Sequence, residues 1–270
     1  MNWITLDHVT LRYALTGHGP RTLVLLHELG GSLESFDGLM PALEQDFRVL
    51  RYDQRGAGGS EKPRAPFSLS DHADDLAQIA AALGIAGPLL LAGVAAGAAI
   101  AVAYALAVPE AVAALALCAP ALTVADDRVR YLAERSELAV RAGMAAIADA
   151  SLERSYPPVM RRDPAVFAAY RARFLANDPV GYAHANLALA DVRIEERLGE
   201  LAQPCLVLAG AHDLLRPPEA VEPLAARIAH ARYAVIDSGH LMPVQAPDEM
   251  GRRLAGFFAA VPRPALVRAS

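Results

Sequence analysis

Cysteine and lysine are scarce in this chain of 270 residues, and it contains no run of basic side chains. The two cysteines, Cys118 and Cys205, lie in apolar segments without a CxxC partner, so we expect buried free thiols in a reducing compartment. The formal net charge of -5 and the lack of basic runs exclude a nucleic-acid-binding surface. The first residues lack the basic and apolar segments of a secretory signal, so we expect a cytoplasmic protein.

Charge is also missing from the long stretch 76–109, which is long enough to cross a bilayer. Gly84, Gly87 and Pro88 interrupt this stretch early, and two more glycines lie in its middle. A buried strand followed by a buried helix explains the pattern better than a membrane span. We therefore expect no membrane-spanning segment and no membrane partner.

Short apolar runs alternate with helical patterns along most of the chain. Nearly continuous apolar runs are typical of parallel strands that are covered on both faces. The alternation predicts an α/β fold with a doubly wound, mostly parallel sheet, and the first 16 residues are expected to form an antiparallel hairpin at its edge. The predicted strands span 22–29, 47–53, 88–94, 112–119, 204–210 and 231–237. The predicted helices span 33–45, 70–84, 95–108, 217–229 and 245–260, with Ser70 or Asp71 as the cap of the second.

The segment 123–197 departs from this alternation. It contains helical patterns rich in arginine, alanine and tyrosine, and no convincing buried strand. At about 150 residues per domain, the chain corresponds to one large domain or to one domain with an insertion. We therefore predict an α/β core formed by 1–122 and 198–262, a helical cap formed by 123–197, and a loose tail at 263–270.

The segment GVAAG at 93–97 joins a predicted strand to a predicted helix. Gly93 and Gly97 flank the central Ala95 at the spacing of the G-x-S-x-G nucleophile elbow, in which a strained turn leaves no room for larger neighbours. The serine of that motif is absent here. Because a tight strand–helix turn in an alanine-rich chain can show this spacing by chance, the motif needs support from other segments.

Three other segments supply this support. Asp213 follows the predicted strand 204–210, and His240 follows the predicted strand 231–237. The elbow, the acid and the histidine occur in the chain order of open-sheet hydrolases, and each follows a strand end, where an α/β sheet places its active site. The segment HELGG at 27–31 also follows a strand and would supply a second backbone amide to an oxyanion hole.

Together these segments resemble the α/β-hydrolase superfamily, and the resemblance covers essentially the whole chain. The matching blocks are YDQRGAGGSEKP (52–63), GVAAGAA (93–99), AGAHDLLRPPE (209–219) and SGHLMPVQAPDEM (238–250). Within the superfamily, 141–154 and 177–192 are similar to the cap of 3-oxoadipate enol-lactonases. YDQRGAG and the non-serine elbow also resemble the aminoacrylate hydrolases of pyrimidine breakdown.

The resemblance implies a hydrolase that acts on an activated carbonyl of a small molecule, without a cofactor or a metal ion. The carbonyl would belong to a lactone, an ester, an amide or a C–C bond beside a ketone. By resemblance, His240 is the general base, Asp213 is its orienting acid, and the backbone amides of Leu29 and Ala96 form the oxyanion hole. Ala95 occupies the position of the nucleophilic serine.

Ala95 leaves three hypotheses open. In the first, the chain is a serine-type hydrolase whose nucleophile was replaced in order to trap a substrate. In the second, alanine is native, and His240 and Asp213 activate water directly or move protons without covalent catalysis. In the third, the chain is a non-enzymatic binder of a small ligand on a hydrolase scaffold. The presence of both Asp213 and His240 argues against the third hypothesis, because a binder needs no base with an orienting acid.

Glu28 is a second departure from the family pattern, since it stands where an HG-x-G motif has glycine and puts a carboxylate close to the oxyanion hole. Its side chain either turns to solvent or pairs with Arg55, or else it orients the substrate or activates water. Asp53 and Arg55 are expected to brace a loop. His72 is expected at the surface.

The predicted cap also contains candidates for substrate binding. His184 could reach the substrate from the cap. Arg141, Arg161 and Arg162 either solvate the cap helices, or one of them binds a substrate carboxylate. No HExxH motif and no Cys/His cluster is present, so the histidines predict no metal site.

Overall fold

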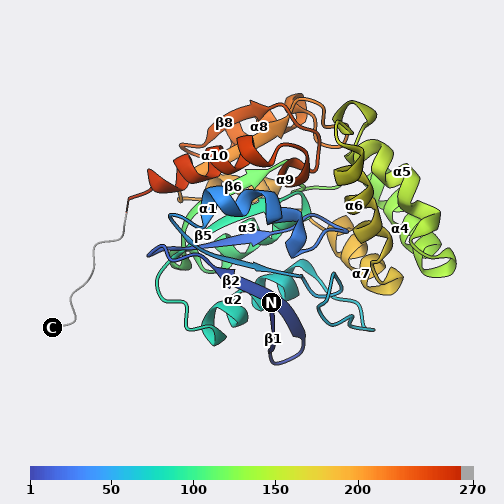
Figure 1. Ribbon diagram of the computed structural model, residues 1–270, viewed down its shortest axis with the longest axis horizontal. Helices are drawn as coiled ribbons and strands as arrows, with labels where there is room; N and C mark the ends of the chain where they lie inside the picture. The colour runs from blue at the N-terminus through green and yellow to red at the C-terminus, as the bar shows by residue number, and fades with distance from the viewer. Residues whose placement is uncertain (263–270) are drawn as a thin grey trace.

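A sheet of eight strands forms the centre of the computed structural model, which describes residues 1–262 (Figure 1). The predicted tail at 263–270 lies outside the described residues. The strand order is β1-β2-β4-β3-β5-β6-β7-β8; β1 and β2 pair antiparallel with their neighbours, and the strands from β4 to β8 are parallel. The strands are β1 (Asn2–Thr5), β2 (Thr10–Thr16), β3 (Thr22–Leu26), β4 (Arg48–Tyr52), β5 (Leu89–Val94), β6 (Val112–Cys118), β7 (Cys205–Gly210) and β8 (Arg232–Ile236). The predicted α/β fold and the edge hairpin are confirmed.

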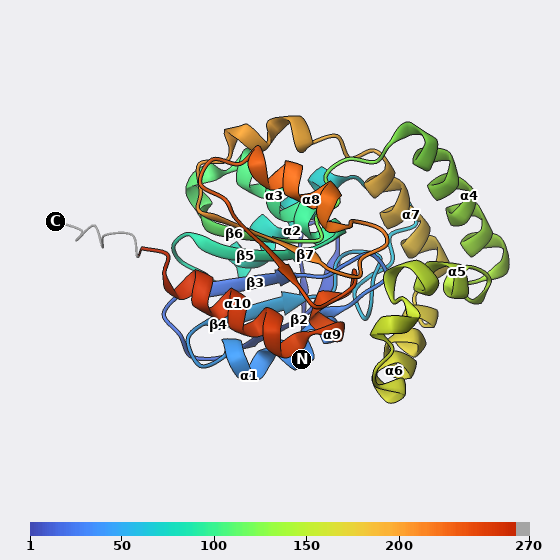
Figure 2. The same cartoon turned by 90° about the horizontal axis from the view of Figure 1, so that it is seen from above.

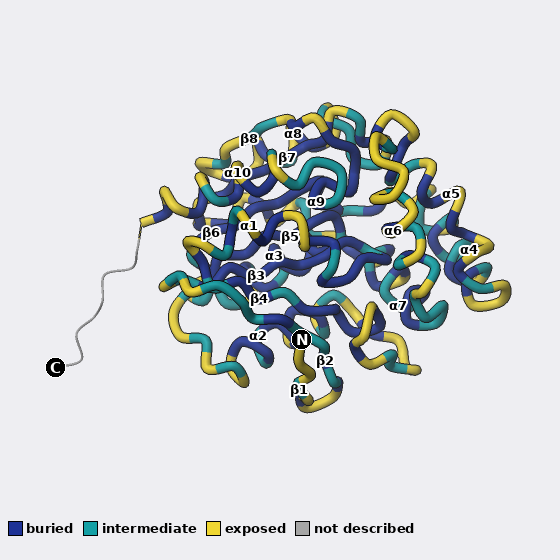
Figure 3. The backbone as a smooth tube through the Cα atoms, viewed as in Figure 1, coloured by how far each residue is buried: buried dark blue, intermediate teal, exposed yellow. Residues whose placement is uncertain are grey.

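Helices cover both faces of the sheet, which is why its central strands are apolar along their whole length (Figure 2). Successive residues of β5 belong to two separate cores: Leu89 and Leu91 contact one, whereas Leu90 and Ala92 contact the other. The first core contains α2 (Leu69–Ala82), α3 (Ala96–Ala107) and α8 (Pro218–Ala226). The second contains α1 (Met40–Leu43), α9 (Met242–Gln245) and α10 (Pro247–Ala259). Figure 3 shows the buried strands between these layers.

Four helices lie between β6 and β7 in the chain, and they gather at one end of the molecule, on the right of Figures 1 and 2. They are α4 (Asp126–Ala142), α5 (Ala145–Ser155), α6 (Pro164–Leu175) and α7 (Pro179–Ala190). Two small apolar clusters hold them together and extend to the loops that follow β3 and β8, through Leu29 and Leu241. The four helices therefore form a layer of their own beside the sheet.

Several observed helices start, break or are capped at residues other than those predicted, mostly at prolines. The segment 33–45 forms a 3-10 helix, η1 (Leu33–Leu39), followed by α1, which begins around Pro41. The last predicted helix is split into α9 and α10. Pro247 is the first residue of α10, a position at which the backbone N–H has no partner within the helix, so proline loses no hydrogen bond there. The cap of α2 is Ser68 and neither Ser70 nor Asp71; Asp71 instead completes the capping box.

None of the helices within residues 1–262 is long and apolar enough to span a bilayer. The uncharged stretch 76–109 forms the end of α2, the buried strand β5 and the buried helix α3, as its glycines predict.

Candidate active site

Ala95 occupies the sharp turn between β5 and α3, with φ 51° and ψ -110°. The two flanking glycines are needed for this turn. A Cβ atom at Gly93 would lie 2.3 Å from the carbonyl oxygen of Gly97, and one at Gly97 would lie 2.1 Å from that of Leu26. The turn is also tied to β6, since the Ala95 amide donates to the carbonyl of Cys118 over 2.9 Å. The backbone thus has the strained geometry of a nucleophile elbow with a methyl group at its tip.

His240 and Asp213 meet beside this turn. Nδ1 of His240 lies 2.8 Å from Oδ2 of Asp213, and both residues are buried. The other carboxylate oxygen, Oδ1, accepts the backbone amides of Leu215 and Arg216 over 2.7 and 2.9 Å. Burial opposes ionisation of Asp213, but His240 and these two amides outweigh it, so the pKa of the carboxyl lies below its usual range. With an ionised Asp213, Nδ1 of His240 carries the proton, and Nε2 is free to accept one.

Two backbone amides near Ala95 have no hydrogen-bond acceptor among residues 1–262: those of Leu29 and Ala96. Ala96 is the first residue of α3, where the amides of a helix lack acceptors and its dipole favours negative charge. The loop carrying Leu29 is held by Gln54, whose amide donates to Nε2 of His27 over 3.0 Å and whose side chain donates to the His27 carbonyl over 2.8 Å. The two amides can stabilise a developing oxyanion.

Glu28 corrects one interpretation of the sequence, because it neither turns to solvent nor pairs with Arg55. Its side chain is 1% exposed, and its Oε1 accepts hydrogen bonds from the hydroxyls of Ser35 (2.8 Å) and of Tyr170 in α6 (2.9 Å). Gly31 makes room for the carboxylate, since a Cβ atom there would lie 2.3 Å from Oε1. The Oε2 atom is buried without a partner. Glu28 therefore links the loop after β3 to α6.

The loop that contains Asp53 and Arg55 is braced from both sides. The carboxylate of Asp53 accepts the backbone amides of Leu33 and Gly59 over 2.8 and 2.6 Å. Arg55 donates two hydrogen bonds of 2.7 Å to Asp75 in α2. These contacts fix the segment 52–63 next to the loop that carries Leu29.

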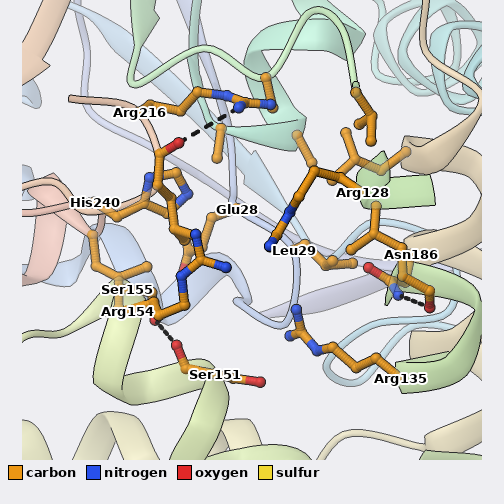
Figure 4. Close-up of a pocket in the computed structure, with 18 of the residues that line it drawn as sticks. Glu28, Leu29, Arg128, Arg135, Ser151, Arg154, Ser155, Asn186, Arg216 and His240 are labelled. Atoms are coloured by element: carbon orange, nitrogen blue, oxygen red, sulfur yellow. Dashed lines mark hydrogen bonds between the residues drawn. The ribbon is translucent and has the colours of Figure 1, made fainter. Parts of the chain in front are cut away.

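A cavity of about 200 Å³ lies between the strand ends and helices α4–α7, and Figure 4 shows its walls. Ala95, His240 and Glu28 line it on the side of the sheet, together with Leu29 and Ala96. The remaining walls come from α4, α5, α6 and α7 and from the loops that follow β6 and β7, and they combine apolar and a few uncharged polar side chains with four arginines. These arginines are Arg128, Arg135, Arg154 and Arg216.

Two of the candidate residues, Arg141 and His184, do not line this cavity. Arg141 is exposed at the end of α4 and is not part of the cavity wall, unlike Arg128 and Arg135 of the same helix. His184 lies in α7 with its ring edge against Phe67, 5.8 Å between ring centroids. Neither residue is among those that line this cavity, and their binding roles remain predictions.

Arg161 and Arg162 also lie outside the cavity wall, and His72 is not at the surface. Arg161 and Arg162 form ion pairs with Glu153 and Asp237 instead of facing the cavity. His72 is buried and not at the surface, since α2 packs its ring against Phe67. The sequence analysis also missed the cavity arginines. Arg128 and Arg135 are seven residues apart, which places them on one face of α4, but this spacing does not say which face the cavity meets.

Residues 1–262 contain no group of three or more His, Cys, Asp or Glu side chains that could hold a metal ion. Both cysteines are buried free thiols, and burial raises the pKa of Cys205 to about 12.

The chain is similar to known hydrolases over most of its length. It is 32% identical over 253 residues to a putative carbamate hydrolase RutD of Rhizobium rhizogenes, which covers 89% of this chain and 93% of that protein. It is 24% identical to the 3-oxoadipate enol-lactonase 2 of Acinetobacter baylyi, over 91% of each protein. The solved structure of the enol-lactonase from Burkholderia xenovorans LB400 has a TM-score of 0.90 at 30% identity and covers 96% of this chain and 100% of that one.

A thermophilic esterase from Thermogutta terrifontis gives a TM-score of 0.89 at 28% identity, with 94% of each chain covered. Residues 21–247 match the family model described as alpha/beta hydrolase fold. This match extends from β3 to the start of α10, so it includes the elbow, Asp213 and His240. The chain is an enzyme of the hydrolase class, and it belongs to the alpha/beta hydrolase fold family.

Proposed function

We propose that this enzyme hydrolyses an activated carbonyl of a small molecule by direct attack of water. The observation that carries the proposal is the His240–Asp213 pair, which lies at the cavity beside an elbow that has no nucleophile. The imidazole is oriented by a buried carboxylate with its Nε2 atom free to accept a proton. A base held in this way activates water without a covalent intermediate.

In the proposed reaction, the oxygen of a water molecule bonds to the substrate carbonyl carbon while its proton passes to Nε2 of His240. The negative charge that develops on the carbonyl oxygen is stabilised by the amides of Leu29 and Ala96. His240 then returns the proton to the leaving oxygen, nitrogen or carbon as its bond to the carbonyl carbon breaks. The methyl group of Ala95 cannot form an acyl-enzyme, and it leaves room for water where a serine hydroxyl would be.

The bond that is cleaved belongs to a lactone, an ester, an amide or a C–C bond beside a ketone. The relatives support this range, since one is named as a carbamate hydrolase and another as an enol-lactonase. Both names describe the hydrolysis of a bond to a carbonyl carbon. We place Leu29, Ala96, His240 and Asp213 in the reaction, and the helical segment 123–197 as the cap that encloses the substrate.

The test is a panel of enol-lactones, aryl esters and small amides assayed at pH 7–8 with the wild-type protein and with His240→Ala. We expect His240→Ala to lose turnover by about 10²–10⁴-fold, the usual contribution of a general base, while folding normally. His212→Ala is the matched control, because this half-exposed histidine pairs with Asp237 away from the cavity. Wild-type activity of His240→Ala would overturn the proposal.

The intact elbow favours a second candidate, a serine-type hydrolase in which Ala95 replaces the nucleophile. Glycines that admit no Cβ atom and a strained φ are what a serine at position 95 requires. The two candidates share His240 and Asp213 and differ in whether an acyl-enzyme forms.

A further inference from the structure

Four guanidinium groups line the cavity, and they come from three different elements. Arg128 and Arg135 lie on α4, Arg154 lies on α5, and Arg216 lies on the loop between β7 and α8. In Figure 4, the side chains of Arg128 and Arg154 extend toward the same space from opposite sides. Like charges that face one space repel each other in a poorly solvated cavity.

These four arginines form no ion pair with a carboxylate in the described part of the chain. Arg135 donates to the hydroxyl of Tyr182, and Arg216 donates to the carbonyls of Leu215 and Thr123. Arg128 stacks over the ring of Tyr131 at 4.5 Å. The contacts of Arg128, Arg135 and Arg216 thus orient these guanidinium groups without neutralising them.

All four arginines are half-buried, and this partial loss of solvent makes their arrangement unfavourable in the absence of a ligand. Burial lowers the pKa of Arg216 from its usual range, although arginine remains charged at any physiological pH. The Nε atom of Arg135 is buried and has no acceptor. Among residues 1–262, Glu28 is the only carboxylate that lines the cavity, and its Oε1 atom already accepts hydrogen bonds from Ser35 and Tyr170. Buried charge and buried donors without acceptors cost free energy that a bound anion would recover.

We propose that the substrate of this enzyme is anionic, with one or more carboxylates bound by Arg128, Arg135, Arg154 and Arg216. The inference rests on the proposed function for the identity of the reacting group, and the arginines give the chemical class of the rest of the molecule. The planar fork of a guanidinium matches the two oxygens of a carboxylate. The carboxylate lies against the arginines while the carbonyl lies between His240 and the amide of Ala96.

This arrangement also explains why the cavity can hold an anion next to Glu28 and Asp213. Asp213 is buried behind His240 and does not line the cavity. Guanidinium groups outnumber carboxylates on the cavity wall, so the local field attracts an anionic substrate. Tight binding of the non-reacting carboxylate orients the carbonyl for attack by water.

The experiment compares two esters that differ only in charge: p-nitrophenyl hydrogen glutarate, which carries a free carboxylate, and p-nitrophenyl methyl glutarate, in which this group is esterified. We expect wild-type kcat/KM to be about tenfold higher for the anionic ester, since a hydrogen bond to a charged group contributes on the order of one decade more than a hydrogen bond between neutral groups. Equal kcat/KM for the two esters would overturn the inference without any variant.

Two variants assign the preference to the arginines. Arg128→Gln and Arg154→Gln should each lower the ratio of the two kcat/KM values by about tenfold, because each removes a charge but keeps a polar side chain. Arg128→Lys should restore part of the ratio. Arg141→Gln is the matched control: it removes an arginine of the same helix that does not line the cavity, and it should leave the ratio unchanged. A ratio that falls as far in Arg141→Gln as in Arg128→Gln would contradict the assignment.

A binding measurement separates failure of this inference from failure of the proposed function. Isothermal titration calorimetry with glutarate needs no turnover. If neither ester is hydrolysed, binding of glutarate that Arg128→Gln weakens by tenfold or more supports the anion site and counts against the hydrolytic proposal. If neither ester is hydrolysed and glutarate does not bind, both proposals fail. Where the esters are hydrolysed, their kcat/KM ratio decides.

Discussion

Alanine rarely adopts a positive φ, because its Cβ atom approaches the backbone, yet Ala95 lies at φ 51°. Strain of this kind persists only where the surroundings impose it. Here the packing of Gly93 against Gly97 and of Gly97 against the end of β3 imposes it, together with the hydrogen bond from Ala95 to Cys118. The elbow geometry therefore belongs to the turn and does not depend on a serine.

Restoring a serine distinguishes the two candidate mechanisms. If the chain is a serine-type hydrolase that lost its nucleophile, Ala95→Ser should raise kcat by several decades, since nucleophile and base act as a unit that is worth on the order of 10⁶. A burst of product would then report the acyl-enzyme. If alanine is native, the wild-type protein already turns over, and the new hydroxyl occupies the place of the attacking water, so kcat stays flat or falls.

The measurement is stopped-flow release of p-nitrophenol from both proteins under identical conditions, with Ala96→Ser as the control for a serine next to the elbow. A burst in Ala95→Ser together with an inactive wild type would contradict direct attack by water. If neither form is active but a small ligand binds tightly, the non-enzymatic hypothesis gains support.

At the scale of elements, Tyr170 of α6 makes the hydrogen bond to the buried Glu28 carboxylate over 2.9 Å. Tyr170→Phe removes the donor and leaves the ring in place. We expect the free energy of unfolding to fall by about 1.5–3 kcal/mol, the usual value for a hydrogen bond to a charged group. Urea denaturation monitored by circular dichroism gives this difference.

Glu28→Gln supplies the matched background for this test. The amide keeps an acceptor for Tyr170 but carries no charge, so Tyr170→Phe should cost only about 0.5–1.5 kcal/mol there. An equal cost in both backgrounds would show that the charge of Glu28 does not strengthen the contact.

The sequence was sufficient to predict the order of strands and helices, because apolar runs and glycine turns are local signals. It was also sufficient to propose Asp213 and His240, since strand ends of a parallel sheet converge. The sequence could not show that Arg128 lines the cavity and that Arg141 does not, because both residues lie on α4 and only tertiary packing decides which face of the helix meets the cavity. The hydrogen bond between Glu28 and Tyr170 could not be predicted either, since the two residues are 142 positions apart in the chain.

At the scale of the whole molecule, two buried groups link stability to pH in the same direction. Asp213 has a lowered pKa, so its contribution to stability is present above its pKa in the unfolded chain and is lost as the pH falls through the folded value. His72 is the stronger case. Burial, then the charges of Arg55 and His27, lower its pKa from 6.5 to about 3.

The direction in which His72 changes the free energy of unfolding with pH follows from proton uptake. Between its two pKa values, the unfolded chain binds a proton at this histidine and the folded chain does not. The free energy of unfolding therefore falls as the pH drops from 6.5 toward 3, by about 1.4 kcal/mol per pH unit for a single group. At pH 4.5 the protein should have lost roughly 2–3 kcal/mol through His72 alone.

His72→Leu tests this prediction, because leucine keeps an apolar side chain between α2 and Phe67 and binds no proton in either state. We expect the variant to show a flatter dependence of unfolding free energy on pH between 6.5 and 4.5, whatever its stability at pH 7.5. The exposed His8 gives the control, since His8→Leu should leave the slope of the wild type unchanged. Urea denaturation at half-unit pH steps measures the slope. If His72→Leu and wild type lose stability in parallel, His72 takes up its proton within the folded protein, and the acid sensitivity has to be assigned to Asp213 and other carboxylates.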